Sequence, residues 1–162
     1  MNTTITRALL LTLVLLLAGV PSSAQLLTKK ALSLEAAKKL ASAAEEFARG
    51  KNWSVAVAIL DDGSNLLLFH RMDGVQIGSI EVAMRKAESA IKFKRSSKAY
   101  SDGVATRPQV MILPGAFPFE GGLPIVHQGE VIGAIGVSGM TAEQDGEVAQ
   151  AAVDAWTKAA AK

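Results

Sequence analysis

The residues best suited to chemistry in this sequence are its two histidines, because imidazole titrates near neutral pH and also binds metal ions. The first, His70, ends a run of apolar residues. Strand alternation places His70 on the face that carries Leu68 and Met72, and it places Arg71 on the opposite face. The pattern leaves open whether His70 is a satisfied structural histidine or a metal ligand.

The second histidine, His127, adjoins an expected hairpin turn opposite Glu130, so a solvent-exposed hairpin end explains it without a ligand. The aspartates Asp61, Asp62 and Asp73 lie beside glycines, where turn formation accounts for them. No serine is marked as an activated nucleophile. The absence of cysteine excludes disulfides, thiolate zinc sites and iron–sulfur clusters. The residues alone therefore assign no catalytic group.

A second candidate feature is the segment before residue 123, where proline, glycine and phenylalanine are unusually dense. Phe117 and Phe119 lie there beside Gly121 and Gly122. These side chains would suit an apolar wall for a flat ligand, an oligomer contact or ordinary core packing. The sequence does not separate these three alternatives.

Three later glycines lie at or near an expected strand. Gly133 and Gly136 interrupt the strand, which indicates that either a ligand or a helix backbone comes close to it. Gly139 leads into a helix N-terminus, whose free N–H groups can accept an anion. The spacing of these glycines matches neither a P-loop nor a dinucleotide fingerprint.

Hydrophobic periodicity predicts the elements that must position these residues. Helices are expected over residues 33–49, over residues 79–93 with Ser79 as the cap, and after a capping box at residues 141–144. Strands are expected over residues 53–60, 66–72, 110–113, 123–127 and 131–138. In the first strand the large residues share one face and alanines the other, so a helix can approach the alanine face closely. An α+β fold with helices packed on an antiparallel sheet follows.

The N-terminal residues have the three parts of a secretory leader: a basic start, an apolar run and small residues before Gln25. We expect residues 1–24 to be a cleaved signal peptide, residues 25–32 a tether and residues 33–162 one domain. The mature chain would then be periplasmic or secreted, without a stable membrane anchor. Its charge is close to neutral, which argues against nucleic acid as the main partner.

A set of short segments, in this order, carries a family resemblance: Trp53-Ser54-Val55, Asp61-Asp62-Gly63, His70-Arg71-Met72-Asp73-Gly74, Lys86-Ala87, Glu120-Gly121-Gly122-Leu123-Pro124-Ile125, Ile132 to Gly139, and Gln144-Asp145. Together they resemble the GlcG/HbpS-type haem-binding (haem-degrading) family over residues 33–160. The resemblance implies a five-stranded antiparallel sheet flanked by helices in a profilin-like arrangement. It also implies a homo-oligomer and, in some members, haem binding. The acidic iron-binding stretch of the secreted haem sensor has no counterpart, since residues 25–34 contain no acidic residue.

The leading hypothesis is an exported oligomer that binds haem or a similar tetrapyrrole non-covalently, for sequestration, sensing or degradation. Haem needs an apolar slot, an iron ligand and cations for its propionates. The candidates for the slot, the ligand and the cations are Phe117, Phe119, Gly121, Gly122, His70, Arg71 and Lys86. Because His70 and Arg71 point in opposite directions, a site shared between subunits would bring both to one ligand.

An alternative hypothesis is an enzyme or binder acting on a small carboxylate-bearing metabolite. Arg71, Lys86 and the helix start near Gly139 would hold the anion, and Glu120 or Asp145 would move protons. A third hypothesis is a structural or sensory accessory module that has no ligand.

Overall fold

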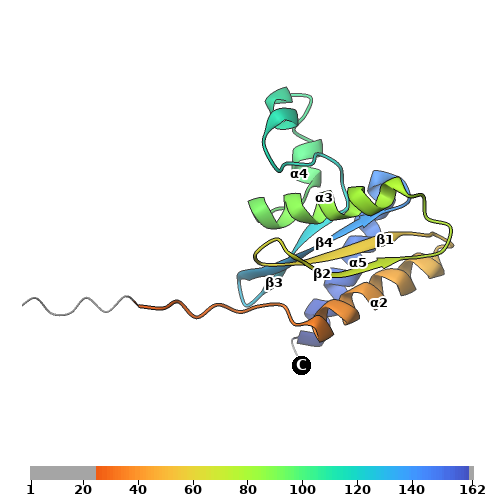
Figure 1. Cartoon of the computed structure of the whole chain (residues 1–162). Helices are drawn as coiled ribbons and strands as arrows, with labels where there is room; N and C mark the ends of the chain where they lie inside the picture. The colour runs from red at the N-terminus through yellow and green to blue at the C-terminus, as the bar shows by residue number, and fades with distance from the viewer. Residues whose placement is uncertain (1–24, 161–162) are drawn as a thin grey trace, which may run out of the picture.

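The computed structural model of the chain describes residues 25–160, in which four antiparallel strands form one sheet in the order β2-β1-β4-β3 (Figure 1). The strands are β1 (Ala56–Asp61), β2 (Leu66–Arg71), β3 (Gly122–His127) and β4 (Glu130–Ser138). The predicted α+β class, with an antiparallel sheet and flanking helices, is confirmed. The expected signal peptide lies outside the described residues.

The expectation of five strands is wrong for the described residues, because the segment predicted as a strand over residues 110–113 is helical. It lies in and just after the 3₁₀ helix η1 (Pro108–Ile112). Pro108 fits the first turn of a helix, where its missing N–H has no partner to lose. Pro114 directly follows residues 110–113 and lacks the N–H that a strand ladder would use. The apolar residues favour a strand, and the flanking prolines favour the tighter turn.

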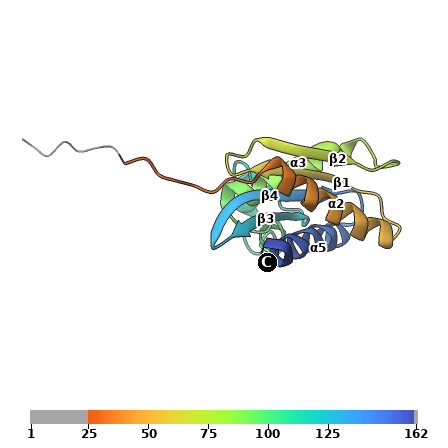
Figure 2. The ribbon, with the colours of Figure 1, turned by 90° about the horizontal axis from the view of Figure 1, so that it is seen from below.

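Three helices cover the two faces of the sheet: α2 (Leu34–Gly50), α3 (Gly78–Phe93) and α5 (Ala142–Ala160). Figures 1 and 2 show α3 on one face, with α2 and α5 on the other. In β1 the small residues Ala56 and Ala58 pack with α3. The larger Val57 and Ile59 pack with α2 and α5. The predicted division of β1 into a small and a large face is therefore confirmed. No helix in residues 25–160 has the length and apolar character to span a membrane.

Two of the three predicted helix starts are confirmed. The Ser33 side chain accepts a hydrogen bond from the Ala36 N–H at 3.2 Å. Thr141 and Gln144 form the reciprocal bonds of a capping box, at 3.2 and 3.3 Å. The expected Ser79 cap is wrong, because α3 already begins at Gly78 and Ser79 is fully buried inside its first turn.

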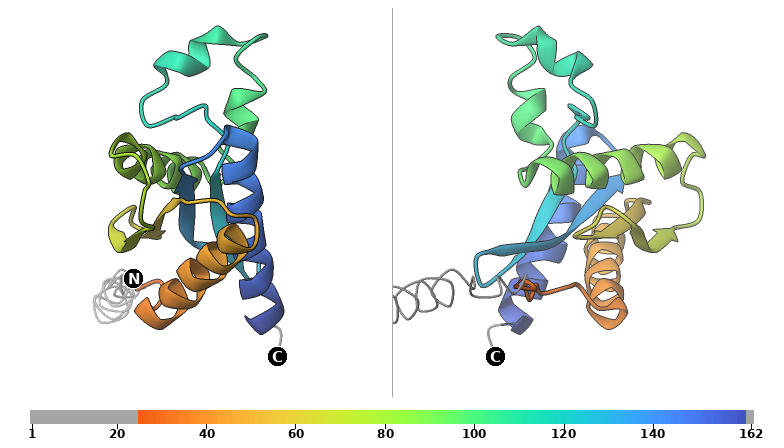
Figure 3. Two further views of the ribbon diagram at one scale, coloured as in Figure 1. Left: turned by 90° about the vertical axis from the view of Figure 1, so that its right-hand side faces the viewer. Right: turned by 60° about the vertical axis from the view of Figure 1, so that its left-hand side comes forward.

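The segment between α3 and β3 projects from the body of the molecule as an arm, residues 98–118, that contains α4 (Lys98–Ser101) and η1 (Figure 3). A small hydrophobic cluster of Tyr100, Val110 and Ala116 is buried there, and Phe93 at the end of α3 packs against it. The β3–β4 hairpin turns at Gln128 and Gly129 as predicted, with positive φ at both residues.

Candidate functional site

His70 lies on the edge strand β2, on the face of the sheet that α2 covers. Its Nδ1 atom is 2.7 Å from Oε1 of Glu45 on α2. The His70 side chain remains 39% exposed, whereas that of Glu45 is 16% exposed. A carboxylate at this distance favours the tautomer that carries the proton on Nδ1, and in that tautomer Nε2 has the lone pair. A carboxylate that orients a histidine in this way is typical of metal-binding histidines.

Arg71 does not share this position. In the β1–β2 register His70 is opposite Val57 and Arg71 is opposite Ala56. Val57 packs with α2, and Ala56 packs with α3. The two neighbouring side chains therefore belong to opposite faces of the sheet, as strand alternation predicted. They do not line one cleft within a subunit.

Lys86 and Asp145 form a buried ion pair that joins α3 to the start of α5. Nζ of Lys86 is 2.7 Å from Oδ2 of Asp145 and 3.0 Å from the Val137 carbonyl oxygen. The side chains are 3% and 2% exposed. Burial lowers the pKa of Lys86 and raises the pKa of Asp145, while their mutual attraction opposes both shifts. The cation and the proton carrier predicted from the sequence are thus bonded to each other.

The second oxygen of Asp145 also has a structural partner. Its Oδ1 atom accepts the Met140 N–H at 3.0 Å, so the carboxylate fixes the turn between β4 and α5. The helix start near Gly139 is part of that turn. A Cβ at Gly139 would lie 2.3 Å from the Ser54 carbonyl oxygen. This position is therefore filled by packed backbone.

The glycine pair at the start of β3, Gly121 and Gly122, makes room for Lys86. A Cβ at Gly121 would lie 2.9 Å from Nζ of Lys86, and one at Gly122 would lie 2.2 Å from the Lys86 carbonyl oxygen. Gly121 also has φ +121°, a conformation that favours glycine. The pair therefore lets the lysine pass the end of the sheet to reach Asp145.

The strand glycines are also explained by close packing. A Cβ at Gly136 would lie 2.0 Å from the Ala83 carbonyl oxygen of α3, and one at Gly133 would lie 2.6 Å from the Leu60 carbonyl oxygen. The predicted close approach of a helix is confirmed at Gly136, whereas the close neighbour of Gly133 is the backbone of β1. Gly133 and Gly136 therefore border packed backbone and leave no space for a ligand.

Phe117 and Phe119 do come together. Their ring centres are 5.0 Å apart, and the guanidinium carbon of Arg85 lies 5.3 Å from the centre of the Phe117 ring. Phe119 is half exposed. Arg85, which no sequence pattern singled out, is therefore a cation beside this aromatic pair.

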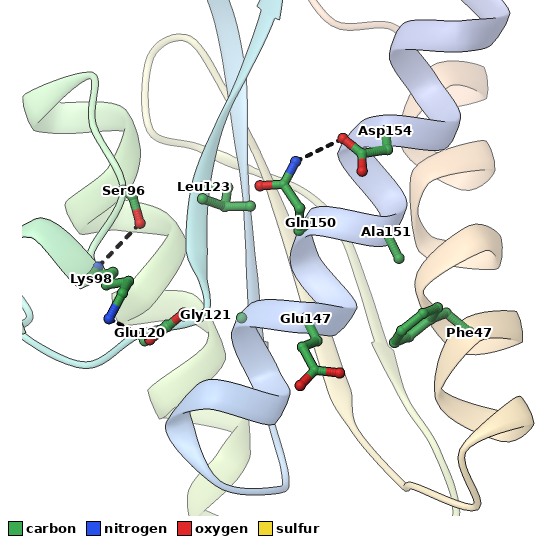
Figure 4. Close-up of a pocket in the computed structure, with 11 residues that line it drawn as sticks. Phe47, Ser96, Lys98, Glu120, Gly121, Leu123, Glu147, Gln150, Ala151 and Asp154 are labelled. Atoms are coloured by element: carbon green, nitrogen blue, oxygen red, sulfur yellow. Dashed lines mark hydrogen bonds and ion pairs between the residues drawn. The ribbon is translucent and has the colours of Figure 1, made fainter.

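A groove of about 530 Å³ runs between α5, β3 and the base of the arm (Figure 4). Its floor includes Gly121 and Leu123. Glu120, Glu147 and Asp154 line it, and Lys98 is the lining cation. Nζ of Lys98 is already shared between Glu120 at 3.2 Å and Asp102 at 3.0 Å. The excess of carboxylates makes this groove a poor site for a carboxylate ligand.

Glu120 and Gly121 were predicted from the sequence as site residues, but the α5 side of the groove was not. Glu147, Gln150 and Asp154 recur at helical spacing on a polar face, which resembles an ordinary solvated face. That face of α5 becomes one side of a groove only because the edge strand β3 lies beside it.

His127 lies at the hairpin end as predicted, and neighbouring residues cover part of its surface. The His127 side chain is partly buried, and its ring centre is 6.4 Å from that of Trp156. Both residues line a hollow of about 320 Å³ with Leu32 and Ile132. His127 therefore packs in an apolar hollow, opposite Glu130 in the register as predicted.

Within residues 25–160, no three histidine, aspartate or glutamate side chains gather closely enough to hold a metal ion by themselves. A single axial ligand of haem does not need such a cluster, because the porphyrin supplies the other ligands.

The comparisons with known proteins place the chain in a family. A family model described as "Haem degrading protein HbpS-like" matches residues 32–154. Protein GlcG of Escherichia coli K12 is 39% identical over 112 residues, covering 68% of this chain and 84% of the relative.

Solved structures agree with this. Klebsiella pneumoniae protein ORFY superimposes with a TM-score of 0.75 at 33% identity, covering 86% of this chain and 98% of that one. A PduOC:heme complex gives a TM-score of 0.71 at 30% identity, covering 78% of this chain and 95% of that one. The chain belongs to the HbpS-like family.

Proposed function

We propose that this chain binds haem or a similar tetrapyrrole non-covalently, with Nε2 of His70 as an axial ligand of the iron. The Glu45–His70 contact carries the proposal, because it leaves Nε2 with a lone pair on a partly exposed ring. The related PduOC structure, described as a heme complex, supports the choice of ligand.

The chemistry around His70 fits part of what haem requires. Leu68 packs on the same side of the sheet, and Met72, just after β2, packs against the cores on both sides, so apolar side chains lie nearby along the strand. The cation for the propionates does not come from the same face, because Arg71 lies on the other one. We therefore propose a homo-oligomer in which a second copy completes the site. Bound haem would supply an iron centre for sequestration, sensing or degradation.

Haem titration of the mature protein tests the assignment. We expect a Soret shift with the wild type and an affinity weakened about tenfold or more for His70→Ala. Glu45→Gln should weaken haem binding by about tenfold, because the carboxylate orients the ligand. His127→Ala is the matched control and should change the affinity by less than about twofold, since that ring is not the proposed ligand.

Circular dichroism of each variant checks that the fold is retained. Identical spectra and affinities for the wild type and His70→Ala would remove His70 from the site. Loss of the Soret shift in His127→Ala alone would move the ligand to the hollow beside Trp156.

We also propose that the chain is exported and that residues 1–24 are removed. The mature protein should then begin at Gln25 and collect in the periplasm or the medium. Intact-mass measurement of the protein from cell fractions checks this. A soluble cytoplasmic form that retains residues 1–24 would contradict it.

A further inference from the structure

The outer side of the arm is apolar and has no cover in the described residues. Met111, Ile112 and Leu113 are consecutive and are 57%, 83% and 40% exposed. We name these three residues the arm tip. Three adjacent large apolar side chains on a projecting segment are unusual on a free surface and indicate a contact site.

The groove on α5 offers a matching surface. Gly121, Gly146 and Ala151 are the small residues of its lining, and Phe47 and Leu123 are its large apolar residues. These residues give the groove an apolar part that can contact another segment, beside the carboxylate side chain of Glu120, which lies over Gly146.

The charges of the two surfaces are opposite. Exposed Arg107 immediately precedes η1, and the arm tip lies at the other end of that short helix. The groove carries Glu120, Glu147 and Asp154, and its one lining cation, Lys98, already pairs with two carboxylates. An arginine entering with the arm tip would meet an excess of negative charge.

The arm does not reach the groove of its own chain. Ser96 and Lys98 at its base line one end of the groove. In both views of Figure 3 the arm leads away from α5. The surface that fits this groove therefore has to come from another molecule.

We propose that the arm tip of one copy docks into the α5 groove of a second copy, with Arg107 facing the groove carboxylates. This inference rests on the homo-oligomer proposed above and assigns the two surfaces that form it. It does not depend on the choice of haem ligand.

The absence of cysteine allows a clean cross-linking test. Ile112→Cys and Gln150→Cys are purified separately, given different masses by a tag on one of them, and mixed under mild oxidation. We expect a disulfide-linked heterodimer. Because each chain carries a single cysteine, such a bond can form only between copies. Ile112→Cys mixed with Lys39→Cys, an exposed position on α2, is the matched control. Cross-linking no greater than in this control would overturn the proposal.

Charge reversal provides a second readout by analytical ultracentrifugation. Arg107→Glu and Glu147→Arg should each raise the dissociation constant about tenfold or more, and their combination in one chain should recover part of the loss. Ile112→Asp should also dissociate the oligomer. An oligomer unchanged by all of these variants would leave the homo-oligomer standing and refute the arm contact. A wild-type monomer would refute both the homo-oligomer and the arm contact.

Vesicle binding tests a different occupant of the arm. Binding of the wild type to anionic phospholipid vesicles, lost in Ile112→Asp without any change in assembly, would assign the arm to a membrane surface instead.

Discussion

Replacing Lys86 with methionine should lower the free energy of unfolding by about 3–5 kcal/mol, because it leaves the carboxylate of Asp145 buried without its cation. The two side chains are 3% and 2% exposed, so water cannot replace the missing partner. Chemical denaturation followed by circular dichroism measures the change. At similar m-values, the shift in midpoint gives the difference in stability.

Two further variants make this result specific. Lys92→Met removes a surface lysine from the same helix, whose i,i+4 partner is Glu88, and should cost about 1 kcal/mol or less. Lys86→Met combined with Asp145→Asn should recover most of the loss. The asparagine is neutral and keeps an oxygen for the Met140 N–H.

The opposite result would restore the role expected from the sequence. A stable Lys86→Met protein, with stability close to that of Lys92→Met, would mean that the ion pair is not what holds these elements together. If that protein also lost affinity for a ligand, Lys86 would be a ligand-binding cation after all.

The sequence was sufficient to predict the layers of this fold, because the patterns that indicate them involve residues close together in the chain. In β1 the alternation of Val57 and Ile59 with Ala56 and Ala58 predicts that both faces are covered, one bearing large side chains and the other small ones. The structure places helices on both faces. The capping box before α5 is equally local, since its two bonds join residues three positions apart. Such patterns depend only on neighbours along the chain.

The pairings at the candidate site could not be predicted in this way. Lys86 and Asp145 are 59 positions apart, and each resembles a residue available to a ligand until both are placed. Glu45 and His70 are 25 positions apart and meet only because α2 crosses β2. The sequence identified residues whose types could bind a ligand, but it did not show which side chains of the protein they pair with.

Gly136→Ala should be among the most damaging single-methyl changes in the chain, at about 3 kcal/mol or more of lost stability. The added Cβ would lie 2.0 Å from the Ala83 carbonyl oxygen and 2.6 Å from the Ala87 N atom. Both atoms belong to the backbone of α3, so no side-chain rotation can relieve the clash. The helix itself has to move away from the sheet.

Gly78→Ala is the matched control, because nothing lies within 4 Å of a Cβ at that helical position. Its stability should be within about 1 kcal/mol of the wild type and on the stabilising side, as alanine is the better helix former. Thermal and chemical unfolding of both variants measure the contrast. If Gly136→Ala were instead as stable as Gly78→Ala while haem binding was lost, the glycine would border a ligand and not α3. If Gly136→Ala lowered both the stability and the haem affinity, while Gly78→Ala left the haem affinity unchanged, Gly136 would act through the packing of α3 on the sheet.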